Sequence, residues 1–123
     1  MVPNPGVGGI MGDRGEVQVG DVYLYTHWDA DRLPEIVKAA MVRGRKVWDD
    51  GEYLARVIFC EMIKDEVMGL SGNGISTQPF DAWRRIYINT DERSIIIRDN
   101  GKFVINMSFE DYVTKSDISR GGQ

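Results

Sequence analysis

The chain has 123 residues, 42% of them hydrophobic, which is enough for one domain with its own core and excludes a chain kept unfolded by low hydrophobicity. Its net charge of −4 argues against a general nucleic-acid binder, and the absence of an apolar run of about 20 residues argues against a membrane protein. A single cysteine excludes an internal disulfide and, without a signal-peptide pattern, predicts a reducing, cytoplasmic location.

The two ends of the chain are expected to lie outside the folded domain. Residues 1–12 hold four of the 14 glycines and two of the four prolines, which predicts a flexible leader, and Met11 is the expected natural start. Residues 114–123 lack an apolar pattern and are expected to form a tail. The domain is therefore predicted to cover residues 13–113.

A β-hairpin is the first predicted element. Apolar and polar residues alternate along residues 16–19 and again along 22–26, which is the period of a strand. The Gly20-Asp21 pair between the two runs is typical of a two-residue hairpin turn, so the runs are expected to pair.

The first predicted helix covers residues 31–43, where apolar residues recur with helical spacing. Asp29 or Asp31 is expected to cap its start, and Pro34 is tolerated in the first turn, where amides have no intrahelical partner. Gly44 is expected to end it.

A second helix is predicted to follow Asp49-Asp50, either of which can cap it, and to run to about residue 65. At about 100° per residue its apolar side chains surround the axis, which predicts a helix enclosed by protein on nearly every side. Glu61 falls among these apolar positions, so it is not expected to be a solvated acid.

The second half of the chain predicts short strands and a last helix. Clusters of β-branched residues indicate strands at about 74–78, 84–89, 94–98 and 102–107, with turns at 89–93 and 99–101. Ser108 followed by Asp111 resembles a capping box for a helix at 109–113. The order predicts an α+β fold with a mainly antiparallel sheet, built from the N-terminal hairpin and the C-terminal strands, and two long helices packed on one face.

A polar and aromatic cluster lies at the junction of the hairpin and the first helix, a place where functional groups are common. His27 can act as a general base there if a carboxylate orients it. The interpretation we favour is simpler: His27 hydrogen-bonds to loop backbone and Trp28 fills the core.

A second cluster joins the two predicted helices. Arg45 and Trp48, with Asp49 beside them, are residue types that can grip a phosphate or stack on a base. We favour a charged, solvated helix end with the tryptophan tucked beneath it and the acids capping the next helix.

Glu61 needs a cation or hydrogen bonds if it is buried. His27 as its partner would make an acid/base pair, whereas an arginine would make a structural ion pair, which we favour. Cys60 lies in mid-helix with no neighbouring base and is expected to be a small core residue. Cys60 and His27 are too few for zinc, so neither a metal nor another cofactor is expected.

Four strings of the sequence are familiar as a set. They are Met11-Gly12-Asp13-Arg14, Val22-Tyr23-Leu24-Tyr25-Thr26-His27-Trp28, Trp48-Asp49-Asp50 and Tyr53-Leu54-Ala55-Arg56-Val57-Ile58-Phe59. Over about residues 11–105 the chain resembles small uncharacterised bacterial proteins of phages and mobile gene cassettes. The resemblance implies a mobile-element origin and Met11 as the start, and it implies no activity or catalytic residue.

The sequence predicts a small binding or assembly module that acts through a surface or subunit interface. It is expected to form a homo-oligomer, because a small body carries many apolar aromatic residues and edge strands and no complete catalytic constellation. The candidate binding residues are His27, Trp28, Arg45, Trp48, Asp49 and Glu61. The alternative is a small hydrolase or ligand-modifying enzyme with a pocket around His27, Trp28, Trp48, Asp49 and Glu61. A third possibility, a nucleic-acid accessory protein using the basic residues 38–48, is disfavoured by the net charge.

Overall fold

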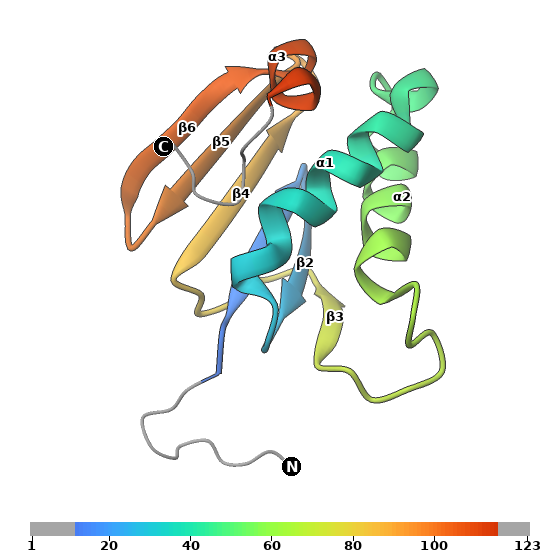
Figure 1. Cartoon of the computed structure of the whole chain (residues 1–123), viewed down its shortest axis with the longest axis vertical. Helices are drawn as coiled ribbons and strands as arrows, with labels where there is room; N and C mark the ends of the chain where they lie inside the picture. Colours follow the sequence, from blue (N-terminus) through green and yellow to red (C-terminus); the bar gives the residue numbers. More distant parts are fainter. Residues whose placement is uncertain (1–11, 116–123) are drawn as a thin grey trace.

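A computed structural model describes residues 12–115 of the chain (Figure 1). In chain order the elements are β1 (Gly15–Val19), β2 (Val22–Thr26), a 3₁₀ turn (Ala30–Arg32), α1 (Leu33–Arg43), a second 3₁₀ turn (Arg45–Val47), α2 (Gly51–Ile63), β3 (Asn73–Ser76), β4 (Arg84–Asn89), β5 (Ser94–Asp99), β6 (Lys102–Ser108) and α3 (Phe109–Thr114). Three predictions fall outside the described residues. They are the leader up to residue 11, the start at Met11 and the tail beyond Lys115.

The strands form one sheet in the order β3-β2-β1-β4-β5-β6. Neighbouring strands are antiparallel except β1 and β4, which run parallel. The parallel pair requires a long connection, and the segment holding β2, both long helices and β3 supplies it. The predicted α+β class with a mainly antiparallel sheet is confirmed.

Two tight turns follow the sequence prediction. Val19 pairs with Val22, so Gly20 and Asp21 form a two-residue loop in which Gly20 has a φ of 61°. Asn100 and Gly101, with φ values of 53° and 85°, make the corresponding loop between β5 and β6. Positive φ at both central residues suits the right-handed twist of the paired strands and favours the Asn-Gly pair.

The two long helices cover one face of the sheet, and α3 lies at its end beside α1 (Figure 1). Inward-facing side chains of the strands meet the apolar stripes of α1 and α2 in one core; its fully buried members include Val17, Leu24, Leu33, Met41, Leu54, Ile58, Ile86, Ile95 and Ile97. Each such side chain contributes about 1.5–3 kcal/mol on burial. Among residues 12–115, no helix combines the length and hydropathy needed to cross a membrane.

The start of α1 corrects the predicted cap. Neither Asp29 nor Asp31 caps the helix with its side chain; a 3₁₀ turn precedes it instead. Asp13 binds this turn from outside, because its Oδ2 accepts a hydrogen bond from the Asp31 N–H at 2.7 Å and its carbonyl accepts one from the Ala30 N–H at 3.1 Å. The stabilising carboxylate is thus distant in sequence, which a local capping rule cannot detect.

The prediction that α2 is enclosed on nearly every side is wrong. Its buried residues are Leu54, Ala55, Val57, Ile58, Glu61 and Met62, whereas Glu52, Tyr53 and Arg56 are exposed. Phe59 and Ile63, beside Arg56 on the helical wheel, are only partly buried. Asp50 caps the helix as expected, accepting a hydrogen bond from the Tyr53 N–H at 3.1 Å. The helix is therefore amphipathic, and it ends at Ile63 rather than near residue 65.

The last helix agrees with its predicted cap. The Ser108 hydroxyl accepts a hydrogen bond from the Asp111 N–H at 3.0 Å, and α3 ends at Thr114, one residue later than expected. The Tyr112 hydroxyl, buried in the core, donates to the Pro34 carbonyl at 2.7 Å. Burial raises the pKa of Tyr112, so this donor keeps its proton and ties α3 to the first turn of α1.

The other face of the sheet carries no helix among the described residues (Figure 1). We call it the open face. Its outward-facing side chains include Glu16, Gln18, Tyr23, Tyr25, Arg85, Tyr87, Ile96, Arg98 and Phe103. The segment 77–83, between β3 and β4, packs Phe80 against Tyr25 at one end of this face.

Candidate functional site

His27 lies in an aromatic cluster directly after β2. Its ring stands edge-on to Tyr25 and to Phe80, with centroid distances of 5.8 and 5.1 Å. Its backbone N–H donates to the Gly72 carbonyl at 3.0 Å, and its own carbonyl accepts from the Asp13 N–H at 2.7 Å. No carboxylate of residues 12–115 forms an ion pair with the ring.

The electrostatic setting of His27 is unfavourable to the charged imidazolium. Burial lowers the pKa of His27 below its ordinary value of 6.5, and the positive charge of Arg14 lowers it further. The neutral ring therefore predominates at pH 7. A neutral imidazole can accept a proton, but this one lacks the carboxylate that would orient it as a general base.

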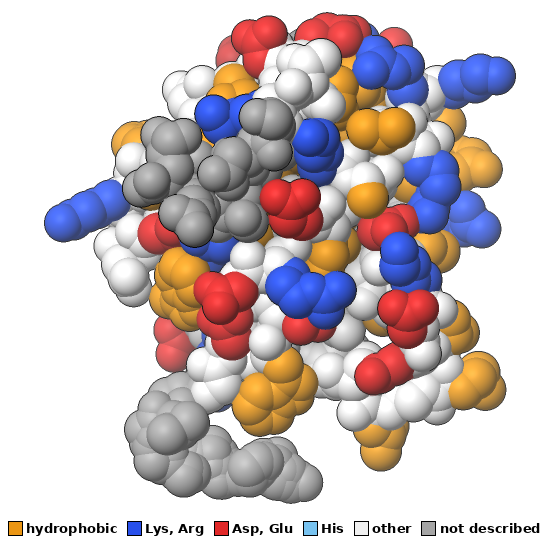
Figure 2. Space-filling view, viewed as in Figure 1, with side chains coloured by type: hydrophobic (Ala, Val, Ile, Leu, Met, Phe, Trp, Pro, Cys, Tyr) orange, Lys and Arg blue, Asp and Glu red, His pale blue; other side chains and the backbone are white. Residues whose placement is uncertain are grey.

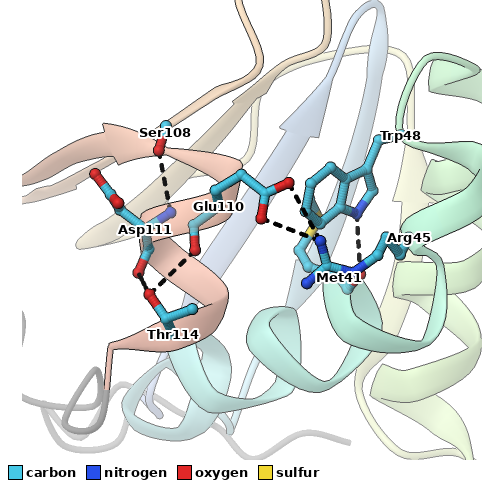
Figure 3. A network of polar contacts seen from close by, with 7 residues as sticks. All are labelled: Met41, Arg45, Trp48, Ser108, Glu110, Asp111 and Thr114. Carbon is cyan, nitrogen blue, oxygen red and sulfur yellow. Dashed lines mark hydrogen bonds and ion pairs between the residues drawn. The ribbon is translucent and has the colours of Figure 1, made fainter.

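Trp48 is a core residue with 2% of its surface exposed. Its Nε1 donates to the Met41 carbonyl at 2.9 Å, and its ring meets Phe109 edge-on at 5.3 Å. Arg45 lies 4.7 Å from the ring centroid and pairs with Glu110 at 3.1 Å (Figure 3). The indole has no face free for a ligand, so this predicted binding residue is structural.

Asp49 is exposed and pairs with Arg93 at 2.6 Å. The Arg93 guanidinium also lies 5.4 Å from the Trp48 ring centroid. With Arg45, this arginine ties the connection between α1 and α2 to the β4–β5 turn and to α3. The second sequence cluster is thus a tryptophan under charged groups, as the favoured interpretation expected.

Glu61 is 7% exposed and holds two cations. Arg43 Nη1 donates to Oε1 at 2.6 Å, and Lys64 Nζ donates to Oε2 at 2.9 Å. Arg43 also donates to the Val57 carbonyl at 3.3 Å, so its side chain bridges the end of α1 to α2. The expected burial of Glu61 and its expected arginine partner are confirmed.

The predicted pocket of His27, Trp28, Trp48, Asp49 and Glu61 does not form. His27 and Trp28 lie side by side in the bend after β2, with ring centroids 6.1 Å apart, but only Trp28 lines the hollow that Glu61 borders. Trp48 fills the core, and Asp49 pairs with Arg93. The structure brings only Trp28 and Glu61 into one hollow. No hydrolytic constellation follows from these residues.

That hollow, which we call the groove, has a volume of about 590 Å³ and lies between α1, the end of α2 and the segment that follows α2. Its lining is Trp28, Asp29, Arg32, Glu35, Ile36, Ala39, Glu61, Met62, Lys64, Asp65, Glu66, Leu70, Ser71 and Asn73. The volume is in the range of ligand-binding clefts. Five carboxylates and two cations share the lining, so the groove is acidic.

The 64–72 loop beside the groove exposes apolar side chains. Met68 and Leu70 are almost wholly exposed, at 94% and 105%, and Val67 is also exposed. The prediction that Trp28 fills the core is wrong, because this residue is 49% exposed after the end of β2. With Ile75 on the edge strand β3, it extends this surface. Figure 2 shows hydrophobic side chains at the lower right rim, where Figure 1 places the α2–β3 loop, with acidic side chains beside them. Apolar side chains gathered in this way mark interaction surfaces.

None of the site residues predicted from the sequence lies in this loop. A signal was present, because Val67, Met68 and Leu70 are three apolar residues in a segment with neither strand nor helix period to bury them. Of the predicted site residues, the groove retains Trp28 and Glu61.

No family model, curated protein or solved structure matches this chain. The resemblance to proteins of mobile gene cassettes therefore stays a prediction. Among residues 12–115, no group of three or more His, Cys, Asp or Glu side chains is placed to hold a metal ion.

Proposed function

We propose that the protein is a small binding module whose groove and 64–72 loop accept a basic, apolar segment of a partner protein. The observation that carries the proposal is a single surface that combines a half-exposed tryptophan, three exposed aliphatic side chains and surplus acid. Tryptophan in a hollow is a common anchor of protein interfaces, and the apolar rim excludes water around it.

The charge of the groove lining determines which sign of charge a partner should carry. Asp29 pairs with Arg32 at 3.5 Å, and Glu61 is neutralised by Arg43 and Lys64. The other three acids of the lining, Glu35, Asp65 and Glu66, form no ion pair with any residue of 12–115 and are exposed. A segment with lysine or arginine beside its apolar residues would complement them.

A second copy of the chain is less suited to this surface. In a two-fold dimer each patch meets itself, so the three free acids would face the same three acids. The whole chain also carries a net charge of −4, so two copies repel each other at long range. Self-association stays a prediction from the sequence, and light scattering over a range of concentrations tests it.

A pair of synthetic peptides tests the proposal. One is an amphipathic helix with leucine on one face and lysine on the other, and the second replaces each lysine with glutamate. We expect calorimetry to detect binding of the basic peptide and no binding of the acidic one. The affinity of the basic peptide should fall as the salt concentration rises, because salt screens exposed charges. Equal binding of the two peptides would show that charge complementarity does not contribute to recognition.

Substitutions locate the binding. Trp28→Ala is expected to weaken the basic peptide at least about 30-fold, the effect of losing a hot-spot anchor. Leu70→Ser, at a side chain with no packing role, is expected to weaken it by several-fold without a change in thermal stability. Val42→Ser, at an exposed apolar residue of α1 outside the groove lining, is the matched control and should leave binding unchanged.

Charge substitutions complete the test. Neutralising Glu35, Asp65 and Glu66 together is expected to reduce affinity about 10-fold, because exposed ion pairs contribute about 0.2–1 kcal/mol each. Neutralising Glu52, Asp91 and Glu92, three exposed acids elsewhere, makes the same change in net charge and should have little effect. Equal losses in both triple variants would show a general charge effect, and a dimer dissolved by Leu70→Ser would make the occupant a second copy.

A further inference from the structure

The strand register arranges the side chains of the open face in rows. In one row Tyr23, Gln18, Tyr87 and Ile96 stand opposite one another on β2, β1, β4 and β5. In the next row Glu16, Arg85, Arg98 and Phe103 follow on β1, β4, β5 and β6. An aromatic row therefore lies beside a charged row, about two residues along the strands.

A hollow of about 370 Å³ lies where these rows meet. Its lining is Glu16, Gln18, Tyr23, Pro79, Arg85, Ile86, Tyr87, Ile96 and Arg98. Pro79 belongs to the segment 77–83, whose Phe80 packs on Tyr25 and hydrogen-bonds to Glu16 and Arg85, so this segment borders the hollow. None of these residues lines the groove, so this hollow is a separate site.

Arg85 is fixed in the floor of the hollow. Its Nη1 donates to Glu16 Oε2 at 2.5 Å, and its Nη2 donates to the Phe80 carbonyl at 2.6 Å. Glu16 is buried, and its second oxygen accepts from the Phe80 N–H. One carboxylate thus neutralises Arg85 and holds its guanidinium in a single position, still partly exposed to the hollow.

Arg98 is the uncompensated charge of the hollow. It stands directly opposite Arg85, and like charges in that position repel. Within residues 12–115 its side chain forms no ion pair or hydrogen bond, and its guanidinium lies over the Phe103 ring, 4.4 Å from the centroid. The lining holds two guanidinium groups and one carboxylate, so the hollow has a net positive charge in a chain whose net charge is negative.

The aromatic row can accommodate the planar ring of a ligand. Tyr23 and Tyr87 flank Gln18 on neighbouring strands, so their backbones are about 10 Å apart, two strand spacings. Aromatic rings pack with centroids about 4.5–7 Å apart, so one planar ring between the tyrosines can contact both. Ile96 continues the apolar floor toward the arginines.

We propose that the open face holds a binding site for a small planar aromatic anion, a ring that carries one carboxylate or phosphate group. The ring lies between Tyr23 and Tyr87, and the anionic group binds Arg98, with Arg85 held beside it by Glu16. The bound anion also removes the repulsion between the two arginines. The volume of the hollow is sufficient for such a ligand and lies at the lower end of the range for small-molecule sites.

Two ring-bearing anions and their separated parts test the site. The probes are hydroxybenzoate and adenosine monophosphate; the parts are phenol, adenosine and inorganic phosphate. We expect at least one probe to bind more tightly than each of its parts, with amide shifts confined to β1, β2, β4 and β5. The probe that binds identifies the anionic group as carboxylate or phosphate. If neither probe binds, or if the parts bind equally well, the proposal is overturned.

Arg98→Gln is expected to weaken the bound probe about 10- to 100-fold, which is the range for a hydrogen bond to a charged group. Arg56→Gln is the matched control, because Arg56 is also exposed, free of ion pairs within residues 12–115 and placed over an aromatic ring, but on α2. Tyr87→Leu should weaken the probe and leave any binding of inorganic phosphate unchanged. Full binding by Arg98→Gln, or an equal loss in Arg56→Gln, would contradict the assignment.

Discussion

At the scale of single residues, Glu61 shows how the protein keeps a carboxylate inside an apolar helix face. Arg43 reaches it from α1, the neighbouring helix, and Lys64 reaches it from the next turn of its own chain. Both cations are more than half exposed, so the pair has access to solvent on one side. The ion pair therefore avoids much of the desolvation cost of a fully buried pair.

Substitution of Glu61 separates these two contacts. Glu61→Gln is expected to lower the free energy of unfolding by about 1–2 kcal/mol, below the value for a fully buried pair because its partners are solvated. Lys64→Gln should cost less than about 0.5 kcal/mol, because Lys64 is an exposed cation at the end of the helix, three residues after Glu61. Urea denaturation of these two variants, of Arg43→Gln, and of the double variants that combine Glu61→Gln with each of the other two measures both couplings. An unchanged stability of Glu61→Gln would mean that the acid is merely solvated.

The single histidine offers a direct measurement of its surroundings. Because burial and Arg14 lower the pKa of His27, its ring resonance is expected to titrate in NMR spectra with a midpoint below 6.5. Arg14→Gln should raise the midpoint while leaving it below 6.5, since burial is the larger cause. A midpoint at or above 6.5 in the wild type would contradict the described cluster.

The same shift has a consequence for stability. A depressed pKa in the folded state means that the unfolded chain binds the proton more readily, so this contribution to stability is present above pH 6.5 and is lost as the pH falls below it. His27→Gln removes the contribution. We expect the variant to lose less stability than the wild type between pH 7 and pH 5, as measured by urea denaturation.

At the scale of elements, the start of α1 depends on a residue outside the helix. Asp13 accepts hydrogen bonds from the Asp31 N–H and from Trp83 Nε1, both at 2.7 Å, so it joins the helix start to the entrance of β4. Asp13→Ala is expected to cost about 1.5–3 kcal/mol of unfolding free energy. Asp29→Ala, at the residue the local rule would choose, should cost less than about 0.5 kcal/mol, and thermal denaturation of the two variants compares them.

The sequence predicts an element well where the interactions that form it involve residues close together in the chain. The turns at Gly20 and Asn100, and the caps at Asp50 and Ser108, follow from backbone angles and from nearby hydrogen bonds. The cap at Asp13 and the parallel pairing of β1 with β4 arise from contacts across the chain, so no short window contains them. The exposed flank of α2 was missed because a helical wheel counts apolar residues and not the neighbours available to cover them.

The candidate sites follow the same division. An arginine partner for Glu61 could be anticipated, because a buried carboxylate requires a cation. The rows of the open face could not be anticipated. Arg85 and Arg98 are neighbours only because of the register between β4 and β5, and the sequence alone does not determine that register. The place of Trp28 after the hairpin predicts a functional role, but its partners in the groove come from both helices and the 64–72 loop, which no local pattern joins.

At the scale of the whole molecule, one helix layer on one sheet leaves two different surfaces. The helix side presents an acidic groove with an apolar rim, and the open face presents a smaller hollow with surplus positive charge. Because the two sides carry charges of opposite sign, they favour different ligands, and the two proposed sites can be tested independently. Loss of one activity by substitution should therefore leave the other intact.

Mapping of the basic peptide by amide chemical shifts tests the central claim most directly, because it shows where the partner binds. The account predicts shifts at Trp28, in the first turns of α1, at the end of α2 and through the 64–72 loop, with the open face unchanged. Shifts confined to the open face, or spread evenly over the exposed acids of the molecule, would contradict it.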